Sequence, residues 1–246
     1  MPRYKLVIEY DGTRFSGWQR QASDPSVQQS VEEAVEAFCG HPVRLHCAGR
    51  TDAGVHATHQ VAHVDLVKAW RTDVVRDASN ARLKALVPVS VLSAEIVPDD
   101  FDARISARRR YYIYRILDRR APPALDRNRV WHVPVKLDPE AMDRAAKALL
   151  GQHDFTTFRA AECQANSPIR TLDRLDVRRE GSEIVVYTHA RSFLHHQVRS
   201  IVGSLKMVGA GRWPEDRMGQ VLAARDRSQC AALAPSSGLY LAGVDY

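Results

Sequence analysis

The stretch RYKLVIEYDGTRFSGWQRQASDPSVQQSVEEAVEAFCG, residues 3–40, decides the fold class of this 246-residue chain. Residues 3–10 alternate between apolar and polar side chains and end at an aspartate–glycine turn pair, which is typical of a strand. Ser26 and Gln29 then form a capping box, and apolar residues follow at helical spacing until Gly40. This stretch therefore predicts a strand followed by an amphipathic helix.

The segments after Gly40 continue the alternation. Strands are predicted over residues 43–48, 58–66 and 90–97, and a helix over residues 73–86, which Pro88 ends. The order strand, helix, strand, strand, helix, strand is that of a ferredoxin-like unit. We expect residues 1–105 to form one such unit.

Residues 106–246 repeat this order and predict a second ferredoxin-like half. The expected strands and helices are strand 108–117, a helix from Asp138 to Gly151, strands 171–179 and 183–192, helices 194–209 and 214–225, and strand Leu239–Asp245. The predicted fold class is therefore α+β, with two ferredoxin-like (βαββαβ) halves. We expect their mostly antiparallel sheets to form one continuous sheet with a central RNA-binding cleft.

Charge narrows the function classes without deciding between them. The chain has 35 lysines and arginines against 29 acidic residues, a net charge of +6 and a pI near 9.3. A solvated basic surface and a nucleic-acid-binding surface both fit this excess. Arginines at 108–110 adjoin Tyr111, Tyr112 and Tyr114, and aromatic rings beside guanidinium groups suit unstacked bases.

The compartment is predicted from what the sequence lacks. The N-terminus has no signal-peptide pattern, and nowhere do about eighteen apolar residues run together. The 4 cysteines lie far apart without a CxxC pair, so neither a disulfide framework nor a thiolate zinc site is indicated. We expect a cytoplasmic protein.

The loop CAGRTDAGVHA, residues 47–57, carries the strongest chemical signal. Its two glycines allow backbone angles closed to other residues, and Arg50 and Asp52 place opposite charges two positions apart. Taken alone, a simple turn in which Asp52 caps backbone amides competes with a functional loop. Tyr112 as a core residue of a strand and Arg199 as a surface residue of a helix are equally open alternatives.

The segment GRTDAGVHA resembles the signature loop of the TruA family of tRNA pseudouridine synthases. The resemblance extends over nearly the whole chain through EYDGTRFSGWQRQ, FDARISA, FRAAECQ, SFLHHQVRSIVG and GLYLAGVDY, in this order. It implies the pseudouridine synthase fold and the isomerisation of uridine to pseudouridine. It also implies that the substrate is the anticodon stem-loop of tRNA, at positions 38, 39 and 40, and that the reaction uses an aspartate nucleophile and no cofactor.

The resemblance implies roles for four residues. Asp52 takes the place of the catalytic aspartate, and Arg199 that of the arginine that pairs with it. Tyr112 matches the tyrosine that stacks on the target uracil, and Arg50 the residue that holds the flipped nucleotide and its backbone. The chemistry fits, because the acid must stay ionised in a cleft and a guanidinium partner favours the charged form. The family also implies a homodimer, with one tRNA anticodon arm touching both subunits.

The sequence around Arg199 departs from the family at two positions. Gln197 and Ser200 stand where members often carry methionine and asparagine, which leaves the details of the pocket open. His195 and His196 precede them at a predicted helix start. Adjacent positions do not share a helix face, so we do not expect them to act as paired metal ligands.

Two rival functions differ in class from a synthase. One is a non-catalytic RNA-binding module of ferredoxin-like fold, although the usual aromatic recognition segment is absent. The other is a hydrolase, motivated by Asp52 together with the histidine group His56, His59 and His63. A metal is not expected, because on a strand of period two only His59 and His63 share a face.

Overall fold

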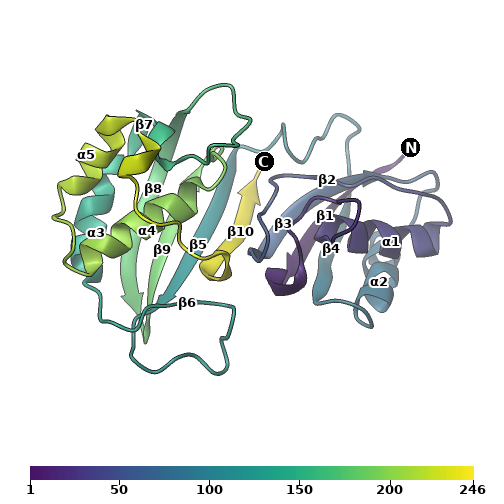
Figure 1. Ribbon diagram of the computed structural model, residues 1–246. Helices are drawn as coiled ribbons and strands as arrows, with labels where there is room; N and C mark the ends of the chain where they lie inside the picture. Colours follow the sequence, from purple (N-terminus) through teal and green to yellow (C-terminus); the bar gives the residue numbers. More distant parts are fainter. The chain divides into compact units, whose positions relative to one another are not determined.

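The computed structural model describes residues 1–246, which divide into two units (Figure 1). The first unit contains Met1–Arg110 and the C-terminal residues Tyr240–Tyr246, and the second contains Tyr111–Leu239. Each unit combines helices with a mostly antiparallel sheet, so the predicted α+β class is confirmed. The continuous sheet and the cleft concern the arrangement of the units and stay predictions.

The first unit has the predicted order of strands and helices. Its elements are β1 (Arg3–Tyr10), α1 (Val27–Cys39), β2 (His46–Cys47), β3 (His56–Asp65), α2 (Thr72–Leu83) and β4 (Val89–Val97). β1 lies between β4 and β3 and is antiparallel to both. β2 pairs with one end of β3, and the C-terminal strand β10 (Leu239–Asp245) pairs in parallel with the other.

The predicted helix start and stop of α1 are both confirmed. The Ser26 side chain accepts a hydrogen bond from the backbone N–H of Gln29 at 3.3 Å, and Gly40 ends the helix in the left-handed region at φ 77°. The alternating face of β1 is buried, as predicted, and α1 packs against α2, which packs against β4. This unit therefore folds around the stretch that opens the chain.

β2 is shorter than the strand predicted over residues 43–48. The backbone N–H of Leu45 donates to the buried carboxylate of Glu32 on α1, at 3.0 Å, instead of joining a strand ladder. α2 also ends earlier than predicted, at Leu83. The backbone N–H groups of Leu86 and Val87 both donate to the carbonyl oxygen of Leu83, so the chain turns tightly there before Pro88.

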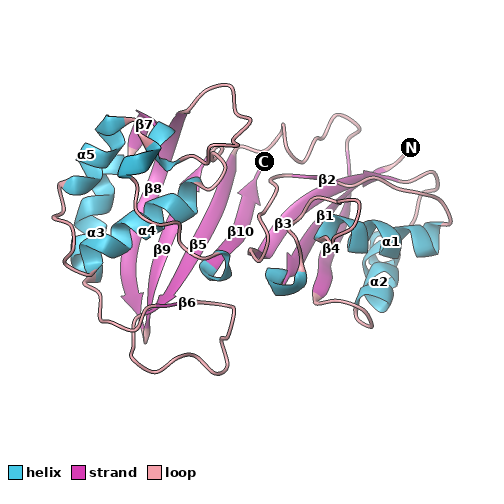
Figure 2. Ribbon diagram, viewed as in Figure 1, coloured by secondary structure: helices cyan, strands magenta, loops and turns pink.

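The second unit contains the remaining strands and helices (Figure 2). Its elements are β5 (Arg109–Leu117), which begins in the first unit, β6 (Trp131–His132), α3 (Pro139–Ala146), β7 (Gly151–Asp154), β8 (Ile169–Glu180), β9 (Glu183–Ala190), α4 (Gln197–Gly209) and α5 (Arg217–Ala224). The strand order is β5-β9-β8-β7, and β6 pairs in parallel with β5. α3 packs against both β8 and α4.

Two local signals in this unit are confirmed. The Asp138 side chain accepts from the backbone N–H of Ala141 at 2.9 Å and so caps α3, which Pro139 opens. The β8–β9 hairpin turns at Gly181, whose φ is 58°. Five 3-10 helices complete the chain: Gly12–Arg14, Lys147–Leu149, Thr156–Phe158, Arg227–Gln229 and Ser236–Gly238.

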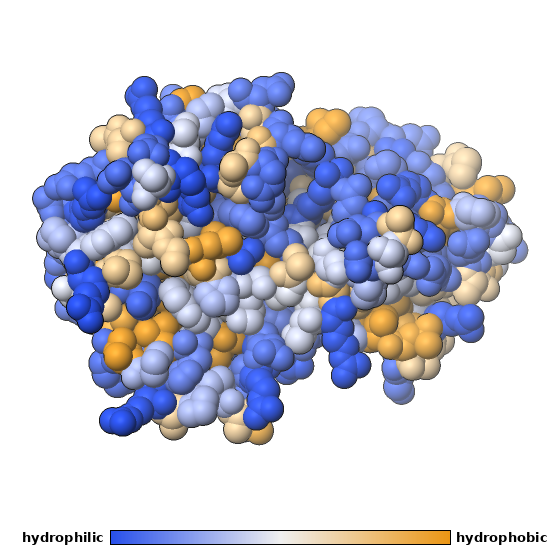
Figure 3. Space-filling model, viewed as in Figure 1, coloured by the Kyte–Doolittle hydropathy of each residue, from blue (hydrophilic) through white to orange (hydrophobic).

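Figure 3 shows a face on which polar side chains prevail and apolar side chains form small separate patches. The large apolar side chains with less than 2% exposure include Trp18, Tyr4, Tyr114, Phe155 and Phe158. None of the helices combines the length and the apolar character needed to span a membrane.

Candidate active site

The loop that carries Asp52 follows β2, and buried side chains hold its first two carbonyl groups. The guanidinium of Arg110 donates to the carbonyl oxygen of Ala48 from Nε at 3.1 Å and from Nη2 at 2.8 Å. Gln60 on β3, which is 0% exposed, donates from Nε2 to the carbonyl oxygen of Gly49 at 2.7 Å. Because buried donors and acceptors are costly to leave unpaired, these bonds fix where the loop begins.

Residues 11–18, from the EYDGTRFSGWQRQ motif, hold the loop from a second direction. The backbone N–H of Trp18 donates to the carbonyl oxygen of Thr51 at 3.0 Å. The backbone N–H of Gly54 in turn donates to the carbonyl oxygen of Phe15 at 3.2 Å. Asp52 therefore sits between two residues whose backbones are bonded to this segment.

Two glycines permit this close approach. A methyl group at Gly12 would collide with the carbonyl oxygen of Val55. Gly17 has a φ of 103°, and a Cβ there would lie 2.7 Å from the carbonyl oxygen of Thr51. Other residues are strained at such a φ and would push the loop away, so glycine is required at both contacts.

Two members of the histidine group are engaged by the backbone. His56 is buried, and its Nδ1 accepts from the backbone N–H of Gly12 at 3.0 Å. His63 is also buried, and its Nδ1 accepts from the backbone N–H of Ala103 at 3.0 Å. His59 is exposed. The group that motivates a hydrolase thus has two Nδ1 atoms already used by the fold.

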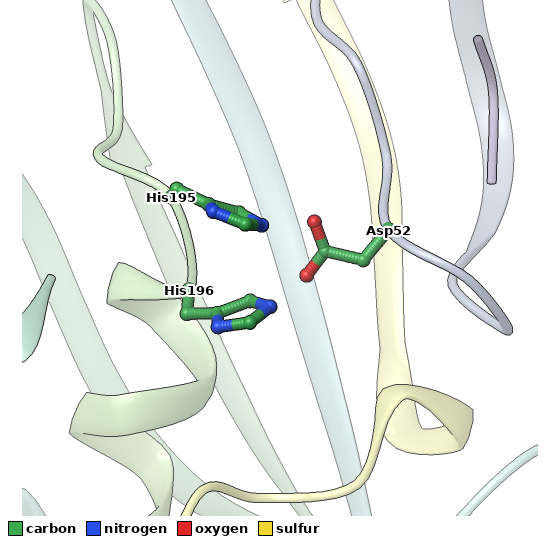
Figure 4. A group of neighbouring side chains, drawn as sticks. All are labelled: Asp52, His195 and His196. Atoms are coloured by element: carbon green, nitrogen blue, oxygen red, sulfur yellow. The ribbon is translucent and has the colours of Figure 1, made fainter. Parts of the chain in front are cut away.

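The two charged residues of the loop differ in their surroundings. Asp52 is half-buried, and Figure 4 shows its carboxylate at the end of a side chain that extends from the loop. Arg50 is exposed and has no hydrogen-bond or ion-pair partner within the protein. The turn therefore leaves a guanidinium available for an external anion.

Arg110 is buried, although the run of arginines at 108–110 suggests an exposed position. Arg108 and Arg109 are exposed, but Arg110 is only 8% exposed. Its guanidinium also donates to the carbonyl oxygen of Arg104 at 2.6 Å. The expectation that all three arginines form a basic surface is wrong for Arg110, because the loop carbonyls take its donors.

Arg199 is anchored in the first turn of the second unit's helix α4. Its Nε donates to the carbonyl oxygen of Ala234 at 2.8 Å, and the backbone N–H of Ala234 donates back to the carbonyl oxygen of Arg199 at 3.3 Å. Gly203, one turn further on, packs so closely that a methyl group there would collide with the carbonyl oxygen of Ala232. Arg199 is half-buried, so it is not a simple surface residue of the helix.

α4 begins three residues later than the predicted helix start at 194. His196 adopts a left-handed φ of 63°, and the side chain of Gln197 accepts from the backbone N–H of Leu194 at 2.8 Å. The rings of His195 and His196 lie together, with centroids 4.0 Å apart (Figure 4). The expectation that these two side chains point apart is wrong, because it assumes a helix that has not yet begun.

The two departures from the family differ in how they are accommodated, because Ser200 is hydrogen-bonded whereas the buried Nε2 of Gln197 has no hydrogen-bond partner. Gln197 is 1% exposed and makes the bond to Leu194 just described. Ser200 is 0% exposed, and its Oγ accepts from Nη1 of Arg227 at 2.9 Å. Nothing in the sequence pattern points to Arg227, since 27 positions separate it from Ser200.

Tyr112 lies on β5 at the rim of the core. The ring is half-buried and stands edge-on to Phe193, with centroids 5.1 Å apart and planes at 87°. Tyr114, two residues further along the same face, is fully buried and donates its hydroxyl to the carbonyl oxygen of Pro235 at 2.7 Å. Of these two aromatic residues, Tyr114 is the core residue and Tyr112 keeps an accessible part.

A model of the tRNA pseudouridine synthase family matches residues 6–104 and 145–246. The chain belongs to this family. It is similar to tRNA pseudouridine synthase A of Methylobacterium sp. strain 4-46, at 65% identity over 100% of this chain and 98% of that protein. It is 63% identical to tRNA pseudouridine synthase A of Mesorhizobium japonicum, over 100% of both chains.

The comparison with solved structures adds no weight to this assignment. A chain from the crystal structure of a Cbf5-Nop10-Gar1 complex matches 97% of this chain, which spans about half (48%) of that one. The identity is 14% and the TM-score 0.37, too low for an argument.

The residues predicted for the synthase site are divided between the two units. Asp52 and Arg50 belong to the first, and Tyr112 and Arg199 to the second. The structure brings Asp52 and Arg50 together on one loop.

Proposed function

We propose that this chain converts uridine to pseudouridine at positions 38, 39 and 40 in the anticodon stem-loop of tRNA, with Asp52 as the nucleophile and without a cofactor. As a tRNA pseudouridine synthase, the chain is an isomerase of tRNA processing. The observation that supports Asp52 most strongly is its setting. The loop backbone is bonded on either side of it while its carboxylate remains partly accessible.

The reaction breaks the bond between N1 of the base and C1′ of the ribose and rejoins the same ring through C5. The oxidation state does not change, so no redox cofactor is needed. Attack of the Asp52 carboxylate on C1′ breaks the bond from C1′ to N1 and forms an ester between the acid and the ribose. The released uracil turns, its C5 attacks C1′ and displaces the carboxylate, and the ring then loses the proton from C5 while N1 takes one up. Removal of a proton beside C1′ by the same carboxylate is the alternative route. Both routes require a positioned, ionised acid.

The other three residues have roles that suit their surroundings. The accessible part of the Tyr112 ring stacks on the extruded uracil, which is worth about 1–3 kcal/mol per base. Arg199, held by Ala234, pairs with the Asp52 carboxylate. Arg50, exposed and unpaired, binds the phosphate backbone of the flipped nucleotide.

The proposal includes the setting in which the enzyme works. The partner is the tRNA anticodon arm, which contacts both subunits of a homodimer in the cytoplasm. The net charge of +6 supports a polyanionic partner. Sedimentation of the protein with and without tRNA tests the subunit number.

The test of function is to incubate the protein with unmodified tRNA and to map pseudouridine at each position. We expect product at 38, 39 and 40 from the wild type and none from Asp52→Asn. Loss of a nucleophile lowers the rate by roughly 10⁴-fold or more, while tRNA affinity persists because phosphate contacts supply most of it. Asp100→Asn is the matched control, since Asp100 is exposed and unpaired in the same unit.

A wild type that leaves every uridine unchanged contradicts the proposal. Equal tRNA affinity without chemistry in both proteins would instead favour a non-catalytic RNA-binding module.

A further inference from the structure

Arg14 ends the 3-10 helix Gly12–Arg14, within the segment that holds the Asp52 loop. Its neighbour Phe15 is buried, whereas Arg14 is exposed. Like Arg50, it has no hydrogen-bond or ion-pair partner within the protein. Arg14 is therefore a solvent-exposed cation without a carboxylate partner.

Several other arginines of the first unit have carboxylate partners. Four of them contact a carboxylate at 2.6–3.1 Å: Arg3 with Asp65, Arg20 with Glu32, Arg71 with Asp73 and Arg76 with Asp77. An unpaired charge does not set Arg14 and Arg50 apart, because Arg82, Arg104, Arg108 and Arg109 are also exposed without a side-chain partner. What distinguishes Arg14 and Arg50 is their position on the segments around Asp52.

The positions of Arg14 and Arg50 are linked through the backbone. Phe15, directly after Arg14, accepts from Gly54 at 3.2 Å, and Thr51, directly after Arg50, accepts from Trp18 at 3.0 Å. The two arginines thus lie on segments that are bonded to each other and that flank Asp52. We expect the backbone phosphates of a nucleotide that reacts at Asp52 to pass close to these segments.

We propose that Arg14 is a further substrate-binding residue, which with Arg50 binds the RNA phosphates next to the reacting nucleotide. The inference rests on the proposed function of Asp52. A guanidinium donates two parallel hydrogen bonds to a phosphate, and it stays charged at any pH at which the enzyme works. A pair of such groups compensates the negative charge that a phosphate would otherwise bring close to the Asp52 carboxylate.

The test compares Arg14→Gln with the wild type in binding of unmodified tRNA across a range of salt concentrations. Loss of one phosphate contact lowers the slope of log affinity against log salt by about one, and weakens binding roughly tenfold at moderate salt. The Michaelis constant for tRNA rises with it, while kcat changes less. Arg14→Lys keeps the charge and is expected to keep the salt slope, with part of the affinity.

Arg82→Gln is the matched control. Arg82 is an exposed, unpaired arginine of the same unit, but it lies in the last turn of α2 and not beside the Asp52 loop. The inference is overturned if Arg14→Gln matches Arg82→Gln in slope and affinity, or loses affinity without a change of slope. These results are distinguishable from failure of the proposed function, which is a wild type that forms no pseudouridine.

Discussion

The Asp52 loop and the first half of α4 are both places where a glycine lets a segment with a proposed site residue pack against a neighbouring backbone. Gly17 lies against Thr51 in the loop, and Gly203 lies against Ala232 beneath Arg199. The loop has a turn bond of its own, from the N–H of Val55 to the carbonyl oxygen of Asp52, and otherwise depends on donors from other segments. α4 is held by its internal helical bonds. A substitution that disturbs the packed neighbour should therefore lower the reaction rate more at the loop than at the helix.

The largest effect after loss of Asp52 itself is expected from Gly17→Ala. The new methyl group would meet the carbonyl oxygen of Thr51 at 2.7 Å and the backbone of Ala53 at 3.3 Å, and it also strains φ 103°. The loop must shift, and a misplacement of about 1 Å at a reacting group lowers the rate roughly 100-fold. Single-turnover rates on unmodified tRNA, together with thermal unfolding, measure both consequences.

Gly40→Ala separates strain from collision. Gly40 also has a positive φ, 77°, but a Cβ there has nothing within 4 Å. We expect a loss of about 1 kcal/mol in the free energy of unfolding with an unchanged rate. If Gly17→Ala proves no slower than Gly40→Ala, the loop is not held in the way described here.

A smaller effect is expected from Gly203→Ala on α4. Its methyl group would displace Ala232 and disturb the bond from Arg199 to Ala234, but the helix retains its own hydrogen bonds. We expect a destabilisation of about 1–3 kcal/mol from overpacking, with a rate lowered roughly tenfold. Denaturant unfolding and single-turnover kinetics on the same preparation test this.

The helical control is Gly219→Ala on α5, where a new Cβ would lie 3.8 Å from the Cβ of Ala148, an ordinary contact. Alanine is the better helix former, so this variant should gain about 0.5–1 kcal/mol in stability without a change in rate. A Gly203→Ala enzyme that gains stability in the same way would show that α4 is free to move off Ala232.

The sequence predicts best those elements that local pattern alone determines. The alternation in β1 and the caps of α1 and α3 hold because the residues that form them are neighbours along the chain. The predicted length of β2 and the predicted start of α4 are wrong, because contacts with residues outside the local pattern decide both. Glu32 takes a donor that the strand needs, and the left-handed His196 delays the helix.

The candidate site is harder to predict from the sequence, because it too depends on contacts between residues that are far apart along the chain. From the residues alone, Asp52 fits an ordinary turn, and only the family resemblance singles it out. The contact that holds the loop, from Arg110 to Ala48, spans 62 positions and leaves no local pattern. Gly17 carries a signal only in hindsight, because a glycine in a polar loop does not disclose which backbone approaches it.

The smallest effect is expected from a change of pH on the free energy of unfolding. It should act through the contacts of the Asp52 loop and not through α4. His63 accepts from Ala103, whose segment includes Arg104, an acceptor for Arg110. Burial, with help from Arg3 and His46, lowers the pKa of His63 despite the opposing carboxylates Asp102 and Asp65.

The His63 imidazole therefore binds its proton less readily in the folded protein than in the unfolded chain, where it takes up a proton near pH 6.5. Below that value the unfolded state binds more protons, so stability is lost as the pH falls through the lowered pKa of the folded state. We expect His63→Asn, which keeps an acceptor for Ala103 but does not titrate, to remove a loss of about 1 kcal/mol or less between pH 7 and 5. Urea unfolding at both pH values provides the measurement, and an equal loss in the variant would assign the pH effect to other groups.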